Sequence, residues 1–275
     1  MENDSWEMRQ SAKHDFDLIS ELLFRKQPFT FIRFSDGEME IIRNNRLFIG
    51  DGRISWSKGE VTYKYPDFDK KEFLPKRDFR LREDLIASAI FSETSYIKGI
   101  PTSHNDALAD RNLLVELNRG SLKNLTFADL LINQNFLRFR KRIVPLFHRF
   151  HHVFYLGNFR SRPELMNEYW KLIPLQDNFF ENYDHVLSDS LVSLESLPRY
   201  SLVLSSASSL TNVLGHKIKQ LRQDLTFLDV GTSLHDLVGL QSGIREYHVL
   251  IERNSPTVVF RKLRLRLKDN FNLKW

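Results

Sequence analysis

Pro28-Phe-Thr-Phe-Ile-Arg-Phe-Ser-Asp-Gly-Glu-Met-Glu40 is the stretch around which the rest of the chain can be interpreted. Its first part, residues 29–34, is an apolar run rich in β-branched and aromatic residues, which predicts a buried strand. The run stops at Ser35-Asp-Gly-Glu38, after which apolar residues return at helical spacing. Open α/β sheets bind ligands at the carboxyl ends of their strands. The predicted strand therefore brings two carboxylates, Asp36 and Glu38, to a candidate ligand edge.

The acidic pair Asp36 and Glu38 points to a divalent metal ion. The glycine between them lets the backbone turn tightly, and hard cations prefer carboxylate oxygens. Arg33 and Ser35 add a cation and a hydroxyl, both suited to phosphate oxygens. The same residues also fit an ordinary helix start, with Ser35 or Asp36 as the cap and Glu38 favoured by the helix dipole.

Composition restricts the class of protein. The 275 residues, 41% of them hydrophobic, are enough to bury a large core. We expect one domain, with an N-terminal helix at about 11–25, a core at about 26–250 and a basic tail at 251–275. The absence of cysteine excludes disulfides, thiolate zinc sites and cysteine nucleophiles. The net charge of +5 favours an anionic partner, and the lack of an apolar leader or spanning segment predicts a cytoplasmic location.

Strand-like and helix-like segments alternate along the chain. Further strands are predicted at 95–100, 153–157, 200–205 and 226–231, and a short one at 185–187. Helices are predicted at 78–91, 105–118, 127–139, 160–172, 189–197 and 210–221. This alternation predicts an α/β fold with a Rossmann-like, mostly parallel sheet flanked by helices. Residues 53–77 have no clear pattern and are interpreted as a lid-like insertion or a passive surface loop.

Small, polar residues follow two of the later strands. Ser205, Ser206 and Ser208 end one strand and lead into a helix, whose N-terminal amides can hold phosphate. The second group follows the last predicted strand and comprises Asp229, Gly231, Thr232, His235 and Asp236. Each group alone also fits turn and cap chemistry. In a parallel sheet all these ends lie along one edge, so together they predict a diphosphate site with carboxylates for its metal ion.

Four segments resemble, in order, the GT-D-type glycosyltransferases, formerly a domain of unknown function. Phe31-Ile-Arg-Phe-Ser-Asp-Gly-Glu38 resembles their Arg-(Tyr/Phe)-Gly-Asp-Gly-Glu signature. Ile97-Lys-Gly-Ile-Pro101, residues 201–209 and Leu228-Asp-Val-Gly231 resemble later segments, so the similarity spans residues 24–240.

The resemblance implies a Rossmann-like enzyme that transfers a hexosyl or pentosyl unit, with inversion, from a nucleoside diphosphate sugar, usually a UDP-sugar. The acceptor would be a hydroxyl on a glycan, lipid or protein in polysaccharide or glycoconjugate assembly. The family's Asp-x-Glu motif uses Mn²⁺ (or Mg²⁺), and it corresponds to Asp36 and Glu38. The nucleotide sugar would then contact Arg33, Phe34, Ser35, Ser205, Ser206, Ser208, Asp229, Gly231 and Thr232.

Two positions depart from the family pattern. Ser35 replaces a glycine, and Thr232 stands where the family has a histidine that assists the metal ion. His235 and Asp236 follow three and four residues later. We expect Asp236, and second His235, to deprotonate the acceptor, with His235 also a candidate third metal ligand.

Other features leave alternatives open. An Asp-Gly-Glu at a strand end also suits a metal-dependent phosphohydrolase. The basic composition also suits a non-catalytic nucleotide- or nucleic-acid-binding module. No nucleic-acid-binding motif accompanies it, so we do not expect a nucleic acid as partner. His148-Arg-Phe-His-His152 is more typical of an exposed surface than of a metal site. The tail segment at 258–268 alternates apolar and basic residues, which predicts an edge strand or a peripheral membrane contact.

Overall fold

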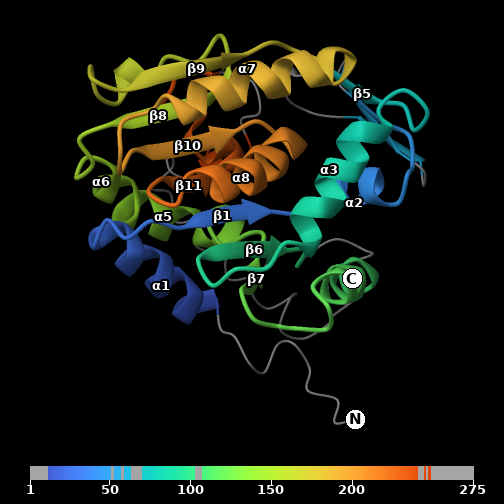
Figure 1. Cartoon of the computed structure of the whole chain (residues 1–275), viewed down its shortest axis with the longest axis horizontal. Coiled ribbons are helices and arrows are strands. Elements are labelled where there is room, and N and C mark those ends of the chain that lie inside the picture. Colours follow the sequence, from blue (N-terminus) through green and yellow to red (C-terminus); the bar gives the residue numbers. More distant parts are fainter. Residues whose placement is uncertain are drawn as a thin grey trace, which may run out of the picture.

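The computed structural model describes residues 12–50, 53–56, 59–62, 70–102, 107–240, 245 and 247–248. In these residues the chain forms a seven-stranded sheet and a second, four-stranded sheet (Figure 1). All neighbours in the larger sheet run parallel, and helices flank it. The predicted α/β fold with a mostly parallel sheet is therefore confirmed.

The order of the larger sheet is β7-β6-β1-β11-β10-β8-β9. Its strands are β1 (Thr30–Arg33), β6 (Tyr96–Ile100), β7 (Leu125–Phe127), β8 (Val153–Asn158), β9 (Lys171–Leu175), β10 (Leu202–Ser206) and β11 (Thr226–Asp229). From β1 the chain builds outward to β6 and β7, then crosses to the other side and returns through β10 to β11 beside β1. The β1–β11 junction is thus the topological switch point, where open α/β sheets bind ligands.

Alternating side chains on the central strands build two apolar layers, one on each face of the sheet. Phe31 belongs to the layer covered by α1 (Ala12–Phe24), α5 (Phe136–Arg142) and α6 (Val144–Phe147). Ile32 belongs to the opposite layer, which contains α2 (Asp36–Ile42), α3 (Phe79–Ile90), α4 (Ala107–Leu117), α7 (Tyr183–Glu195) and α8 (Ser209–Leu221). Because side chains alternate across a strand, a fully apolar run such as β1 needs helices on both faces. Figure 1 shows both helical layers.

The second sheet lies mostly within residues 53–77, the segment that the sequence predicted to be irregular. It contains β2 (Leu47–Gly50), which precedes that segment, β3 (Arg53–Trp56), β4 (Gly59–Thr62) and β5 (Lys71–Phe73) in the antiparallel order β4-β3-β2-β5. The prediction of a lid-like or passive loop is wrong for β3, β4 and β5. Phe73 is fully buried in the same apolar layer as α3, so β5 is anchored to the core. Residues 57–58 and 63–69 of this segment lie outside the described residues.

Three other element predictions are wrong. The predicted helix at 127–139 begins only at Phe136, because Leu125–Phe127 pairs with β6 as strand β7. The predicted helix at 160–172 is a single 3₁₀ turn, Pro163–Leu165, followed by β9. The predicted strand and helix at 185–197 form one helix, α7, whose buried residues recur at helical spacing.

No helix among the described residues is long and apolar enough to span a bilayer. The tail at 251–275 lies outside the described residues, so its edge-strand or membrane role stays a prediction. The helix α1 agrees with the predicted N-terminal helix, and it packs through Phe16, Ile19 and Leu23.

Candidate functional site

A buried ion pair joins β1 to β11 at the switch point. The Arg33 Nη2 atom lies 2.8 Å from Asp229 Oδ1, and the Arg33 backbone N–H donates to Asp229 Oδ2 at 3.1 Å. The two side chains are only 13% and 7% exposed. The Gly231 N–H donates to the same Asp229 carboxylate at 2.9 Å, and the Arg33 Nη1 group donates to the Ala128 carbonyl oxygen at 3.3 Å. Both charged groups predicted to contact the nucleotide sugar are therefore bound to each other.

Gly231 is required at its position by this ion pair. Its φ is +47°, a left-handed conformation that residues with a Cβ rarely adopt. A Cβ atom built there would lie 1.9 Å from Arg33 Nη2. The glycine after β11 thus makes room for the guanidinium.

The acidic pair after β1 divides into an exposed and a buried carboxylate. Asp36 is exposed and accepts a hydrogen bond from the Gly37 N–H at 3.0 Å. Glu38 is buried in the first turn of α2, where its Oε2 atom accepts from the Ser35 N–H at 3.0 Å and from the Ser35 hydroxyl. This is a capping box, and it agrees with the helix start predicted as the alternative to a metal site.

The pKa of Glu38 reports the crowding of carboxylates at this edge. Burial raises it, and the nearby charges of Asp36 and Asp229 raise it further, against the hydrogen bonds from Ser35. Asp36 and Asp229 therefore each lie close enough to Glu38 to disfavour its charged form.

The end of β10 provides two half-exposed serines at the start of α8. Ser206 and Ser208 are half-buried, and Ser208 occupies the cap position with φ +50° and no side-chain cap hydrogen bond. Ser205 is fully buried, and its hydroxyl is paired with the Thr211 hydroxyl at 2.8 Å. The N-terminus of a 13-residue helix is a favourable anion site, and Ser206 and Ser208 lie at this end of α8.

The turn after β11 carries the two candidate bases. His235 is buried, and its Nε2 atom lies 2.9 Å from the Ser206 hydroxyl. Asp236 is more exposed, and its Oδ1 atom accepts a hydrogen bond from Arg140 Nη1 at 3.2 Å. Asp236 Oδ1 also lies 3.7 Å from His248 Nε2.

Tyr247 and His248 are site residues that the sequence interpretation missed. The His248 Nε2–H group donates to the Thr232 carbonyl oxygen at 2.9 Å, while Nδ1 accepts the Arg245 N–H at 2.9 Å. This pattern requires the neutral imidazole, and burial lowers the pKa of His248 accordingly. The Tyr247 hydroxyl forms a hydrogen bond with the Thr232 hydroxyl. No local pattern identifies them, since both follow the last strand outside any predicted element.

Asp129 and Asn212 were also missed. Asp129 comes two residues after β7, and burial raises the pKa of its carboxyl despite a hydrogen bond from Thr102 and the charge of Arg33. The Asn212 side chain donates to the Arg33 carbonyl oxygen at 2.8 Å, which ties α8 to β1. The position of Asp129 just after a strand could have identified it. That strand, β7, has only three residues and was not predicted from the sequence.

The predicted residues thus form two tiers at the carboxyl edge of three adjacent strands, β1, β11 and β10. The accessible tier contains Ser35, Asp36, Ser206, Ser208, Gly231, Thr232 and Asp236. The buried tier contains Arg33, Glu38, Asp229 and His235. Phe34 and Ser205 are not brought to either tier, because Phe34 packs in the apolar layer of α8 and Ser205 lies inside the sheet.

The donor set bears on the expected metal ion. Among the described residues, no group of three or more His, Asp or Glu side chains is arranged to hold a metal ion. His235 therefore does not join Asp36 and Glu38, and its Nε2 atom is bound to Ser206 instead. Two carboxylates still fit the mode in which Mg²⁺ is held by one or two carboxylates with substrate phosphates completing the shell.

Neither a protein-family model nor a curated protein matches this chain by sequence. Among solved structures, "A New Glycosyltransferase (DUF1792) from Streptococcus sanguinis" matches with a TM-score of 0.51 over 86% of this chain and 87% of that chain, at 14% identity. A second structure, described as "The highly conserved domain of unknown function 1792 has a distinct glycosyltransferase fold", matches with a TM-score of 0.47 over 86% of this chain and 88% of that chain, at 13% identity. The fold implied by the resemblance is confirmed: this chain has the fold of the Streptococcus sanguinis glycosyltransferase.

Proposed function

We propose that this chain is a metal-dependent, inverting glycosyltransferase. Its donor is a nucleoside diphosphate sugar, with UDP-sugars as first choice, and its acceptor is a hydroxyl on a glycan, lipid or protein. The observation that carries the proposal is the accessible tier, in which an exposed carboxylate, Asp36, shares one sheet edge with the open N-terminus of α8. The shared fold with a glycosyltransferase supports it.

The diphosphate of the donor lies at the start of α8. Backbone N–H groups of the first turn, with the hydroxyls of Ser206 and Ser208, donate to its oxygens. Gly231 and Thr232, on the adjacent strand end, form the other side of this cradle. Arg33 supports this cradle indirectly, because its ion pair with Asp229 holds β1 and β11 together.

Asp36 and Glu38 would hold a Mn²⁺ or Mg²⁺ ion, Asp36 directly and Glu38 after leaving Ser35. When bound, such an ion neutralises the charge that develops on the departing diphosphate. The rise in the pKa of Glu38 that burial and the charges of Asp36 and Asp229 cause supports a cation at this position.

Inversion needs one base on the face of the sugar opposite the diphosphate. Asp236 is the first candidate, since its accessible carboxylate is oriented by Arg140 and by the neighbouring His248. Its carboxylate accepts the proton of the acceptor hydroxyl as that oxygen attacks the sugar. His235 is the second candidate, although it is buried and its Nε2 atom is paired with the Ser206 hydroxyl.

The test is a turnover assay on the full chain with a panel of nucleotide sugars, with and without Mn²⁺ or Mg²⁺. Metal-dependent release of nucleoside diphosphate and sugar transfer to an acceptor are expected for one donor. Asp236→Asn should lower turnover by about 10²–10⁴-fold and leave nucleotide affinity unchanged. Asp36→Asn should abolish the metal-dependent release of nucleoside diphosphate. Asp184→Asn, an exposed carboxylate on α7, is the matched control and should change neither.

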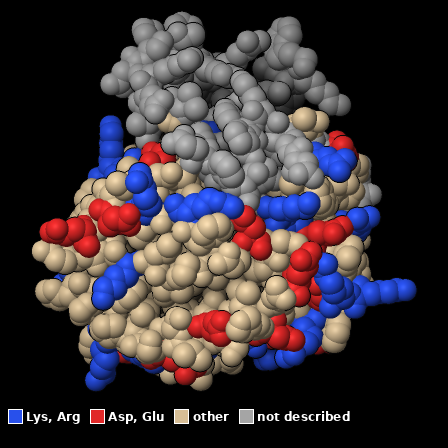
Figure 2. Space-filling view, turned by 90° about the horizontal axis from the view of Figure 1, so that it is seen from above, with Lys and Arg blue, Asp and Glu red and all other residues tan. Residues whose placement is uncertain are grey.

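The same assay distinguishes the two alternatives. Phosphate release without sugar transfer would instead identify a phosphohydrolase. Salt-sensitive binding of DNA without turnover would identify a nucleic-acid-binding module. On the face shown in Figure 2, the described Lys and Arg side chains are interspersed with Asp and Glu, which argues against a continuous basic patch there.

A further inference from the structure

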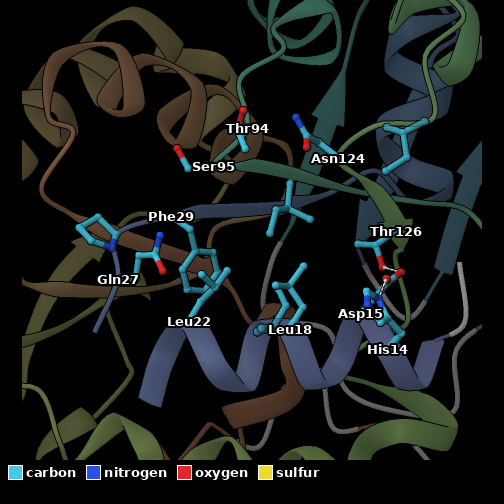
Figure 3. A pocket seen from close by; sticks show the side chains of 14 residues that line it. His14, Asp15, Leu18, Leu22, Gln27, Phe29, Thr94, Ser95, Asn124 and Thr126 are labelled. Carbon is cyan, nitrogen blue, oxygen red and sulfur yellow. Dashed lines mark hydrogen bonds and ion pairs between the residues drawn. The ribbon is translucent and has the colours of Figure 1, made fainter. Parts of the chain in front are cut away.

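A cavity of about 470 Å³ lies at the opposite edge of the sheet, between α1 and the amino ends of β1, β6 and β7 (Figure 3). Phe29, Ser95 and Asn124, which line it, each immediately precede one of these strands. The strands are parallel, so the cavity is separated from the candidate site by the length of the sheet. Its volume lies within the range of small-molecule sites, about 300–1,000 Å³.

The cavity has an apolar wall and a polar end. Leu18 and Leu22 of α1 and Ile97 of β6 line the wall. At one end, Figure 3 shows Asp15 beside Thr126. A hydrocarbon chain can therefore lie along the wall while a polar head reaches Asp15.

The charge of the lining is the opposite of that of the chain. The chain contains 40 Lys and Arg residues, yet none is among the described residues that line the cavity. Asp15 is the carboxylate of this lining, and its side chain is only 9% exposed. Phosphate groups and other anions are therefore disfavoured here, which separates this cavity from the proposed donor site.

Asp15 lies in the first turn of α1 and, among the described residues, pairs with no Lys or Arg side chain. Its Oδ2 atom accepts a hydrogen bond from the Thr126 hydroxyl at 2.7 Å, and its Oδ1 atom lies 3.3 Å from His14 Nδ1. The His14 side chain is 77% exposed, and it bears charge only when protonated. A buried carboxylate is costly unless a cation or several donors pair with it, so an ammonium group entering this end would gain a charge-assisted hydrogen bond.

We infer that this cavity binds a small amphipathic organic cation, with its ammonium group on Asp15 and its apolar chain along Leu18, Leu22 and Ile97. This site is independent of the proposed glycosyltransferase activity. Its ligand has the opposite charge to a nucleotide sugar, and the two sites share no residue.

The test is isothermal titration calorimetry of the full chain with three six-carbon probes: hexylammonium, hexan-1-ol and hexanoate. Hexylammonium should bind one site at least about tenfold more tightly than hexan-1-ol, the effect of one charge-assisted hydrogen bond. Hexanoate should give no saturable binding. Equal affinities for all three probes, or hexylammonium binding weaker than about 10 mM, would overturn the inference.

Three variants localise the binding. Asp15→Asn keeps the side-chain shape and an oxygen for Thr126, and should weaken hexylammonium binding about tenfold, to the level of hexan-1-ol. Leu18→Arg should abolish binding, because it places a guanidinium one turn from Asp15; Leu18 is 42% exposed, so the chain should still fold. Glu21→Gln, an exposed carboxylate of α1 outside the cavity, should bind as the wild type does. Unchanged hexylammonium affinity in folded Leu18→Arg would also overturn the inference.

Discussion

Two buried cations lie on adjacent strands, and their positive charges are compensated in different ways. Arg33 on β1 and Lys98 on β6 are one position apart in the parallel register, where Ile32 pairs with Lys98. Burial opposes the charge of Arg33, but the ion pair with Asp229 outweighs it and raises the pKa of the guanidinium. Lys98 has three neutral acceptors at 2.6–2.8 Å, and burial lowers its pKa to about 8.

The partners explain the different roles of the two cations. Lys98 donates to the carbonyl oxygens of Ala89 and Phe91 at the end of α3, where helix carbonyls lack partners of their own, and to Asn118. It is a helix cap. Arg33 pairs with a carboxylate at the switch point, beside Gly231 and the acidic tier. Burial of a cation therefore does not by itself distinguish the candidate site from a helix end; the candidate site differs in pairing its cation with a carboxylate.

The largest effect is expected from breaking the Arg33 ion pair. Arg33→Met leaves Asp229 charged and buried without its cation, which should lower the free energy of unfolding by about 3–5 kcal/mol. Urea-induced unfolding measures this loss. The double variant Arg33→Met/Asp229→Asn should recover much of it, because no unpaired charge remains and the amide oxygen can still accept from a backbone N–H group at this position.

The matched control is the exposed pair of Arg80 and Asp184, whose side chains are 60% and 58% exposed. Arg80→Met should cost only about 0–1 kcal/mol, since exposed ion pairs contribute little. Similar losses for Arg33→Met and Arg80→Met would contradict the role given to the buried pair.

The next effect is a pH dependence that belongs to Lys98. Its pKa is about 8 in the folded chain against 10.5 when exposed. Between these values the unfolded chain holds a proton that the folded chain has released, so the free energy of unfolding should rise with pH, by at most about 3 kcal/mol. Urea unfolding at pH 8 and at pH 10.5 measures the rise.

Lys98→Met should lack this increment, and Lys76→Met, which removes an exposed lysine, should keep it. The same pH slope in wild type and Lys98→Met would mean that the helix-capping amine stays charged throughout.

The smallest effect concerns the glycine beside the Arg33 pair. Gly231→Ala and Gly120→Ala both place a Cβ at positive φ, +47° and +71°, which should cost about 1–2 kcal/mol each. Only at Gly231 does the new Cβ meet Arg33, while nothing lies within 4 Å at Gly120. We expect Gly231→Ala to cost about 1 kcal/mol more than Gly120→Ala by thermal unfolding. An equal cost would show that the guanidinium moves aside freely.

The central strands could be predicted from the sequence, and the edges could not. The strands β1, β6, β8, β10 and β11 are apolar runs, because helices cover both faces of a parallel sheet. The edge strand β9 contains Pro174, which an edge tolerates but which weakens the strand pattern. The three-residue strands β5 and β7 are too short to show a period, since their pairing comes from neighbours distant in sequence.

The candidate site was predicted in position more than in detail. Asp36, Ser206 and Thr232 lie on adjacent strand ends because parallel strands align their carboxyl ends. The carboxylates of two nearby residues are buried instead: Glu38 caps its own helix, and Asp229 pairs with Arg33. Composition cannot distinguish these outcomes, because the same carboxylate suits a cap, an ion pair or a metal ion.

The sequence by itself determined the central strands and the placement of small polar residues at their ends, since both follow from local periodicity and turn chemistry. Only the tertiary structure decided which charges are buried together and which stay accessible. Arg33 and Asp229 are 196 residues apart, and His248 reaches Thr232 from outside any predicted element. Such pairs form because a buried charge or donor must find a partner in space, wherever that partner lies along the chain.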